Sequence, residues 1–399
     1  MSKPRLLYAS PFAPVQSGIS EYSRYLVEGL AEFFDITLFT GDYELSDTTL
    51  RQKFRVVKYQ KGQNAALAEH PYRVYNIGNN PWYHDYIYQS CLEAPGVVIL
   101  HDAVIYYLVV GLYQDRPDFL ARVYRLEGAR GVALIKEQMK RGTPLFQYSE
   151  AHLLPFLGEL LGSGNRILVH SGYALRLLEN RFPSHASLGR IDMAIPFRGQ
   201  SCAENALEVR RRIGVPAGAT LICSFGFVAP VKLNHSVCEA VELTRRRTGK
   251  DVHYCMVGEG NYTDQYLSDS VRVTGYVPDS VYNDYLRCAD LVVNLRYPSM
   301  GETSIALLRA LALGKPCIVT NHAWFSELPD SVVLKTGIPG REDVTQQLVR
   351  AFECFLNDPG PFQAMGQAAA QYVRQRHAPS VAAERLRQYL IEPPAAGVS

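Results

Sequence analysis

The stretch that decides the fold runs from Asn294 to Thr320 and reads NLRYPSMGETSIALLRALALGKPCIVT. An apolar run at its start predicts a short buried parallel strand, which a proline and a glycine end. Thr303 or Ser304 can then cap a largely apolar helix, and Gly314 stops that helix before the next strand begins. The stretch is therefore a β-α-β unit. Its turn at residues 300–304 follows the carboxyl end of a strand, where open α/β sheets bind ligands.

This polar turn combines a flexible backbone with hydrogen-bonding groups. Gly301, the carboxylate of Glu302 and two hydroxyls stand at a predicted helix start, where unpaired N–H groups favour an anion. A phosphate or an electron-rich sugar oxygen would fit such a turn. An ordinary capped helix after a βα turn explains the same residues equally well, so a ligand role depends on the rest of the chain.

Length and charge limit the class of protein. At 399 residues and 47% hydrophobic content, the chain can fill two or three ordinary domains. Its net charge of +2 gives no overall attraction to nucleic acid. Two local basic runs, Arg210–Arg212 and Arg245–Arg247, are typical of solvated helix faces. We therefore expect no nucleic-acid partner.

The eight cysteines stand singly, without a C-x-x-C pair or a His/Cys cluster at zinc spacing. This usage indicates small buried thiols in a reducing compartment and no metal site. The chain has no signal-like start, and no stretch approaches the roughly 18 apolar residues of a membrane-spanning helix. A soluble, cytoplasmic protein is the expectation.

Short apolar strands alternate with helical or loop segments in both halves of the chain, as a parallel sheet requires. Strands are expected in the first half at Arg5–Ser10, Ile36–Thr40, Phe54–Tyr59, Arg73–Ile77, Val97–Leu100 and Arg166–Val169. In the second half they are expected at Leu221–Phe225, Val252–Val257, Val271–Val277, Leu291–Leu295 and Cys317–Val319. The sequence therefore predicts an α/β protein of two Rossmann-like, doubly wound domains that face each other across a cleft.

The domain boundary is expected within residues 191–205, which show no periodic pattern and hold Pro, Gly and small polar residues. We expect an N-terminal domain over 1–195 and a C-terminal domain over 206–375. Residues 376–399 are expected to form a helix and tail that pack back on the first domain.

Two strand ends of the first half carry candidate site residues. Ser17 and Gly18 stand at a helix entrance, where N–H groups can face a phosphate, although plain turn chemistry explains them too. His101 follows the strand Val97–Leu100 and is expected to point into a ligand crevice. The alternative for His101 is that it only ties neighbouring loops together.

Residues 122–142 carry basic side chains between apolar ones in a predicted helical region. Such a pattern fits peripheral contact with an anionic lipid surface, at the inner face of the membrane, or an acidic acceptor. It fits a solvated helix at least as well. Both interpretations stay open at this point.

The order of these features resembles family 4 glycosyltransferases of the GT-B fold. The features are Ser17-Gly18, His101-Asp102, Gly226 with Lys232, Gly258-Glu259-Gly260, Gly275-Tyr276-Val277 and the polar turn before LLRALALGKPCIV. The similarity runs over most of the chain and is strongest from about residue 220 to 320. Each motif is weak alone, but their shared order and spacing are specific.

The resemblance implies a nucleotide-sugar donor held mainly by the C-terminal domain, an acceptor held mainly by the N-terminal one, and transfer with retention and without a metal or cofactor. With the resemblance, we expect catalytic roles for His101, Lys232 and Glu302. The expected donor-binding residues are Ser17, Gly18, Gly226, Gly258, Glu259, Gly275, Tyr276, Val277, Met300, Gly301, Thr303, Ser304 and Arg309.

The chain departs from the family pattern at three positions. Phe227 stands where most members have an arginine before the lysine. Gly301 and Arg309 stand where most members have two glutamates spaced eight apart, and Glu302 is one residue off. The full pair is therefore missing. Arg309 donates hydrogen bonds where the family accepts them, so it is a candidate phosphate partner.

The predicted function is transfer of a hexose from a UDP- or GDP-sugar to a hydroxyl of a glycan or lipid-linked acceptor, in polysaccharide or glycoconjugate synthesis. One alternative is a catalytically silent GT-B subunit that only binds. A less favoured one is an NAD-dependent oxidoreductase, because neither half has G-x-G-x-x-G between its first strand and helix.

Overall fold

The computed structural model describes residues 3–62, 65–183, 187–196 and 206–391. The chain divides into two compact units. The first comprises residues 1–196, 300–303 and 377–399, and the second comprises residues 197–299 and 304–376. The turn at 300–303 is thus grouped with the first unit, although its chain neighbours belong to the second.

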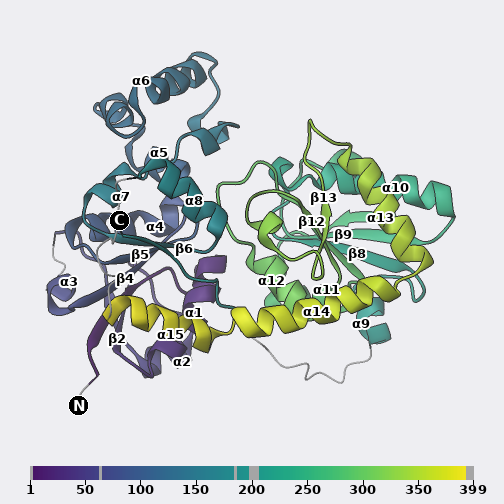
Figure 1. Cartoon of the computed structure of the whole chain (residues 1–399), viewed down its shortest axis with the longest axis horizontal. Helices are drawn as coiled ribbons and strands as arrows, with labels where there is room; N and C mark the ends of the chain where they lie inside the picture. The colour runs from purple at the N-terminus through teal and green to yellow at the C-terminus, as the bar shows by residue number, and fades with distance from the viewer. Residues whose placement is uncertain (1–2, 63–64, 184–186, 197–205, 392–399) are drawn as a thin grey trace. The chain divides into compact units, whose positions relative to one another are not determined.

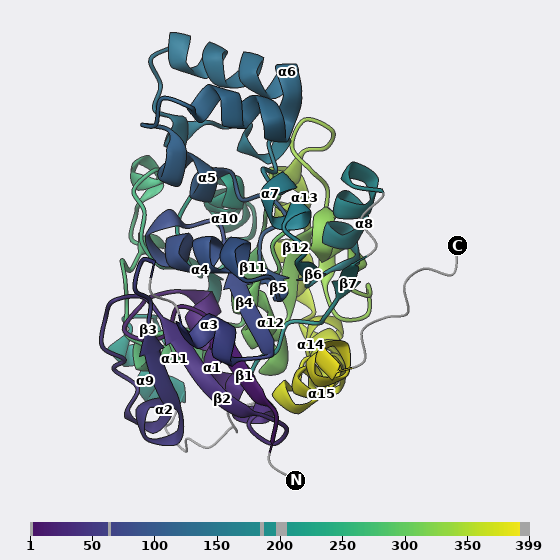
Figure 2. The ribbon, with the colours of Figure 1, turned by 90° about the vertical axis from the view of Figure 1, so that its left-hand side faces the viewer.

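The first unit is built on a seven-stranded sheet in which every strand pair is parallel, with the order β3-β2-β1-β4-β5-β6-β7. Figure 2 faces this unit. The strands are β1 (Arg5–Ala9), β2 (Asp35–Thr40), β3 (Arg55–Lys58), β4 (Tyr72–Ile77), β5 (Val97–Leu100), β6 (Arg166–Val169) and β7 (Leu188–Arg190). The strand order reverses between β1 and β4, and such a switch point opens a ligand crevice at the carboxyl ends of the strands.

Helices join these parallel strands, because a parallel connection must cross back over the sheet. They are α1 (Gly18–Leu30), α2 (Thr48–Lys53), α3 (Ala65–Glu69), α4 (Pro81–Glu93), α5 (Tyr106–Tyr113), α6 (Phe119–Lys140), α7 (Gly158–Gly162) and α8 (Gly172–Arg181). Side chains cap four of them: Ser17 caps α1, Asp47 caps α2, Asn80 caps α4 and Ser171 caps α8.

The last helix, α15 (Pro379–Ile391), belongs to the first unit. It packs on α1, and its Arg385 forms an ion pair with Asp192 at 2.7 Å. Arg166 donates a hydrogen bond of 2.8 Å to the carbonyl of Tyr389. The end of the described chain is therefore fixed to its beginning.

The second unit holds a six-stranded parallel sheet with the order β10-β9-β8-β11-β12-β13. Its strands are β8 (Thr220–Phe225), β9 (Val252–Val257), β10 (Val271–Val273), β11 (Leu291–Asn294), β12 (Cys317–Thr320) and β13 (Leu334–Thr336). The switch point lies between β8 and β11. The turns that follow these two strands therefore border the expected crevice.

Helices cover both faces of this second sheet (Figure 1): α10 and α13 pack together on one face, and α12 packs with α14 on the other. The helices are α9 (Ala206–Arg212), α10 (Asn234–Thr248), α11 (Asp279–Cys288), α12 (Ile305–Ala312), α13 (Val344–Asn357) and α14 (Gly360–Arg376). The central strands β8, β9, β11 and β12 are almost entirely buried. Apolar runs in the sequence are therefore enough to locate them.

Two expectations about the strands need correction. The strand predicted at Val271–Val277 ends at Val273, because Gly275 adopts a φ of +71°. The two edge strands β7 and β13 were not predicted, since three residues give too short a pattern. Most of the predicted boundary segment, residues 197–205, lies outside the described residues.

Candidate functional site

In the first unit, the predicted phosphate turn is a helix cap. The hydroxyl of Ser17 accepts a hydrogen bond of 3.2 Å from the backbone N–H of Ile19. Gly18 begins α1 and is exposed. The hydroxyl of Ser17 therefore serves as the helix cap. Gly18 presents its backbone at a helix start, where anions are favoured.

His101 follows β5, but its ring lies inside the unit and only 5% of the residue is exposed. Its Nδ1 lies 3.1 Å from Nε2 of His170, and its Nε2 lies 3.2 Å from Oδ1 of Asn76. Nδ1 of His170 lies 2.9 Å from the carbonyl of Ile191. These contacts are the ones expected if His101 ties neighbouring loops together, which is the alternative to a ligand-facing role.

The carbonyl of Ile191 determines which ring nitrogens of His170 and His101 carry a hydrogen. A carbonyl only accepts, so Nδ1 of His170 carries a hydrogen, and Nε2 of the neutral ring accepts from Nδ1 of His101. Nε2 of a neutral His101 then has no hydrogen. It faces Oδ1 of Asn76, whose amide nitrogen donates 3.1 Å to the carbonyl of Ala9. His101 could donate to this oxygen only as an imidazolium, and the oxygen accepts a hydrogen bond of 3.4 Å from the hydroxyl of Tyr8.

Burial opposes that imidazolium. It is the main cause that lowers the pKa of His101 well below its ordinary value, and the nearby His170 lowers this pKa further. Burial also lowers the pKa of His170 and of His84 to about 4. The ring of Tyr22 packs edge-on against His101 and His170 at 5.0 and 5.3 Å. At neutral pH His101 is therefore a neutral, rigidly held ring.

In the second unit, the structure brings together the glycine turns that follow β8, β9 and β10. A Cβ on Gly258 would lie 2.3 Å from the carbonyl oxygen of Gly226, so the two backbones touch. The N–H of Gly258 donates 3.2 Å to the hydroxyl of Thr274, which in turn donates 2.8 Å to the carbonyl of Gly275. Gly226, Gly258 and Gly275 therefore form one continuous surface.

Lys232 lies at this surface. Its Nζ donates a hydrogen bond of 2.8 Å to the carbonyl of Phe225, the last residue of β8. A Cβ on Gly226 would lie 2.8 Å from that Nζ, and Gly226 has a φ of +86°. Glycine at this position therefore makes room for the ammonium group. Glu259 is exposed on the neighbouring turn, where its carbonyl accepts 2.7 Å from the N–H of Val228.

The turn before α12 is partly closed on itself. Ser304, rather than Thr303, is the helix cap, and its hydroxyl accepts a hydrogen bond of 3.2 Å from the N–H of Leu307. A carboxylate oxygen of Glu302 accepts a hydrogen bond of 2.7 Å from the N–H of Met300. The buried hydroxyl of Thr303 has no hydrogen-bond partner among the described residues. It is therefore a candidate donor to a ligand.

Arg309 contacts the helix α11. Its guanidinium donates a hydrogen bond of 2.9 Å to Oδ1 of Asn283 and lies 4.3 Å from the ring centre of Tyr282. That ring packs on Phe225 at 4.8 Å. Arg309 therefore lies near the same strand end as Lys232. The two other aromatic residues of this region, Phe227 and Tyr276, are 71% and 62% exposed.

Sequence reasoning missed several residues that hold this arrangement. His170 follows β6 as His101 follows β5, and Asn294 is the last residue of β11. Their position at the carboxyl end of a strand was the available signal. Asn294 donates 3.2 Å to the hydroxyl of Ser304 and so joins β11 to the start of α12. The contacts of Tyr282 and Asn76 carry no signal in the sequence, because their partners lie far away along the chain.

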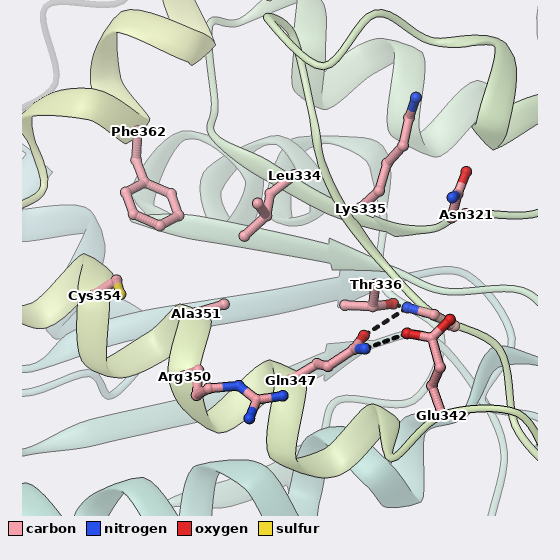
Figure 3. A pocket seen from close by; sticks show the side chains of 11 residues that line it. Asn321, Leu334, Lys335, Thr336, Glu342, Gln347, Arg350, Ala351, Cys354 and Phe362 are labelled. Carbon is pink, nitrogen blue, oxygen red and sulfur yellow. Dashed lines mark hydrogen bonds between the residues drawn. The ribbon is translucent and has the colours of Figure 1, made fainter.

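A pocket of about 510 Å³ opens elsewhere in the second unit, between β13 and α13 (Figure 3). Gln347 projects into it, accepts a hydrogen bond of 2.6 Å from the N–H of Gly337, and donates to Glu342. No predicted site residue lines this pocket. We therefore do not assign the donor to it.

Residues 122–142 correspond largely to α6, which is interrupted at Gly128 (φ +69°). Arg122 forms an ion pair with Glu159 and lies 3.7 Å from the ring centre of Tyr113, so it is used inside the unit. Arg125 and the basic residues after it on α6 are exposed. Among the described helices, none is both long and apolar enough to cross a membrane.

Comparison with known proteins connects the second unit to a family. Residues 219–358 match the family model described as Glycosyl transferases group 1. The putative teichuronic acid biosynthesis glycosyltransferase TuaC of Bacillus subtilis is 33% identical over 131 residues, which is 33% of this chain and 32% of that protein. The chain thus matches about a third of the length of this curated relative.

Solved structures connect the whole chain to a fold. HepE from Anabaena, solved with UDP and glucose, has a TM-score of 0.66 at 13% identity, over 97% of this chain and 99% of HepE. WaaG, a glycosyltransferase involved in lipopolysaccharide biosynthesis, has a TM-score of 0.63 at 15% identity, over 97% and 100%. The fold is that of GT-B glycosyltransferases, and the prediction of two parallel-sheet Rossmann-like domains is confirmed.

The buried histidines generate a pH prediction. The pKa values of His84 and His170 are near 4 when folded and about 6.5 when unfolded, so between these values only the unfolded chain takes up the protons. The free energy of unfolding should fall by about 2 kcal/mol per histidine between pH 7 and pH 5.

Denaturant unfolding at several pH values measures this effect. His84→Gln should make the pH dependence shallower, and the same replacement of the half-buried His235 serves as the control. Equal pH dependence in the wild type and in His84→Gln would contradict the buried neutral cluster.

Proposed function

We propose that the protein is a retaining, metal-independent glycosyltransferase that moves a hexose from a UDP- or GDP-sugar to a hydroxyl of a glycan or lipid-linked acceptor. The observation that carries this proposal is the surface formed by Lys232 and the turns of Gly226, Gly258 and Gly275. It lies beside the switch point of the second sheet, within the segment that matches Glycosyl transferases group 1.

A diphosphate leaving group explains why a cation is needed at this surface. Negative charge builds on the diphosphate as the glycosidic bond breaks, and preorganised cations and N–H groups stabilise it. We assign this role to Lys232 and to the helix start at Ser304, with Arg309 as a second cation. The HepE structures contain UDP or UDP-glucose, which makes a UDP-sugar the first donor to test.

The transfer step needs no separate base in this proposal. The acceptor hydroxyl attacks the anomeric carbon from the face that the diphosphate leaves, and its proton passes to the departing phosphate oxygen. Glu302 would accept hydrogen bonds from the donor sugar. His101 would stay neutral, because burial lowers its pKa, and would contribute a rigid wall rather than a charge.

A second candidate function is a catalytically silent subunit that binds a nucleotide or glycan. It is favoured by Gly301 and Arg309, which stand where the resembling family has its two glutamates, and by Phe227 in place of an arginine. Under the first candidate, the protein turns over a nucleotide-sugar. Under the second, it binds one without consuming it.

Lys232 provides a direct binding prediction. UDP should raise the melting temperature of the wild type, and Lys232→Ala should weaken UDP binding at least about tenfold, because a charge-assisted hydrogen bond contributes about 1.5–3 kcal/mol. Lys335→Ala is the matched control, since Lys335 pairs with Asp330 at the distant edge strand. Stabilisation by NAD alone would instead support an oxidoreductase.

Arg309 provides a second prediction. Arg309→Ala should weaken nucleotide binding markedly, measured by calorimetric titration with UDP, if its guanidinium helps to hold the phosphates. Arg350→Ala is the control, because Arg350 is an exposed arginine of the same unit on α13. Unchanged affinity in Arg309→Ala would confine this residue to its contacts with Tyr282 and Asn283.

A further inference from the structure

The first unit has a pocket of about 580 Å³ that the proposed donor site does not use. It lies at the carboxyl ends of β1, β2 and β3 and at the start of α4, elements that Figure 2 shows side by side. This location borders the switch point between β1 and β4, where open α/β sheets bind ligands. Its volume falls within the roughly 300–1,000 Å³ of small-molecule sites.

Aromatic rings dominate the pocket wall. The rings are those of Tyr43, Tyr59, Trp82, Tyr83 and Tyr86. The hydroxyl of Tyr86 donates 2.9 Å to the carbonyl of Ser10, and the hydroxyl of Tyr43 accepts 2.9 Å from the N–H of Phe12. Tyr59 packs on Tyr86 at 6.0 Å. These rings are therefore fixed before any ligand arrives.

Gly41 allows two of the rings to approach each other. A Cβ at this position would lie 3.2 Å from the ring of Tyr43 and 3.3 Å from that of Tyr86. At the rim, Trp82 is 75% exposed although one ring contact, with Phe146 at 5.8 Å, holds it in place. A fixed tryptophan that is mostly exposed to water is typical of a binding surface.

The charged groups of the pocket are acidic. Asp42 and Asp85 both line it and are exposed, and the described lining residues include no lysine, arginine or histidine. Burial raises the pKa of Tyr59, and the nearby carboxylate of Asp85 raises it further. Carboxylates accept hydrogen bonds from hydroxyl groups and repel anions.

We propose that this pocket binds a neutral pyranose, whose apolar ring face lies against the tyrosines and Trp82 while its hydroxyls donate to Asp85 and Asp42. Provided that the proposed function holds, this sugar is the terminal residue of the acceptor. The loop from Pro14 to Gln16 lines the pocket and continues directly into Ser17 and Gly18, at the start of α1. The pocket thus borders the turn that leads into α1.

Two other classes of ligand fit less well. A uronate or a phosphate group would bring a negative charge to the two carboxylates; Lys58 pairs with Asp42 at 3.7 Å, but it does not line the pocket. A quaternary ammonium group suits aromatic rings and carboxylates, but it is compact and would fill only a small part of this volume. Both classes are outcomes that the experiment distinguishes.

Tryptophan fluorescence of the full chain tests the proposal. The chain has two tryptophans, and Trp324 is buried with 4% exposure, so a ligand in the pocket should change mainly the emission of Trp82. The probes are methyl glycosides of glucose, galactose, mannose and N-acetylglucosamine, with glucuronic acid and choline as the anionic and cationic alternatives.

At least one neutral glycoside should change the emission. Asp85→Asn should weaken its binding about tenfold, the effect of losing hydrogen bonds to a charged group. Asp115→Asn, at an exposed aspartate outside the pocket, should leave the binding unchanged. Saturation-transfer NMR should show binding lost in Trp82→Ala, whose fluorescence cannot report it.

Three results would overturn the pocket assignment: no response to any neutral glycoside, equal affinity in Asp85→Asn and Asp115→Asn, or tighter binding of glucuronic acid or choline than of every glycoside. UDP stabilisation, measured on the same samples, reports separately on the donor site. A protein that binds UDP but no glycoside refutes the pocket alone. A protein that binds a glycoside but no nucleotide refutes the transferase and leaves the sugar site standing.

Discussion

Parallel strand pairing is the constraint on which the rest of this structure depends. In each sheet it places every carboxyl end at one edge, and each sheet reverses its strand order once, between β1 and β4 and between β8 and β11. Turns far apart in the sequence therefore meet at one edge. In the second unit this brings Lys232 beside the glycine turns, and in the first it gathers aromatic residues that follow three strands, β2, β3 and β4, around one pocket.

The candidate sites of the two units differ in charge. The second unit presents a half-buried ammonium group and close-packed glycine backbones, which suit a diphosphate. The first unit keeps His84, His101 and His170 neutral by burial and lines its pocket with carboxylates and phenol rings, which suit an uncharged, hydroxyl-rich molecule. Because of this difference, a donor with two phosphates would bind to the second unit, and an acceptor without phosphates would bind to the first.

Local patterns predicted the parts of the fold that depend on local physics. The apolar run Val97–Leu100 coincides with β5, and Ser304 caps α12 as one of two expected candidates. What failed depends on distant contacts. The ring of His101 lies inward because it meets His170, 69 residues further along the chain. The aromatic pocket was missed because its rings come from separate loops without a motif, and no single loop shows a sugar site.

The most direct test of the central claim, that the second unit grips an activated sugar by its diphosphate, is time-resolved proton NMR of UDP- and GDP-sugars incubated with the protein. The account predicts slow consumption of one nucleotide-sugar, release of a sugar with the anomeric configuration of the donor, and loss of turnover in Lys232→Ala. Release of the opposite anomer would contradict the retaining mechanism. A panel in which no nucleotide-sugar is bound or consumed would contradict the claim itself.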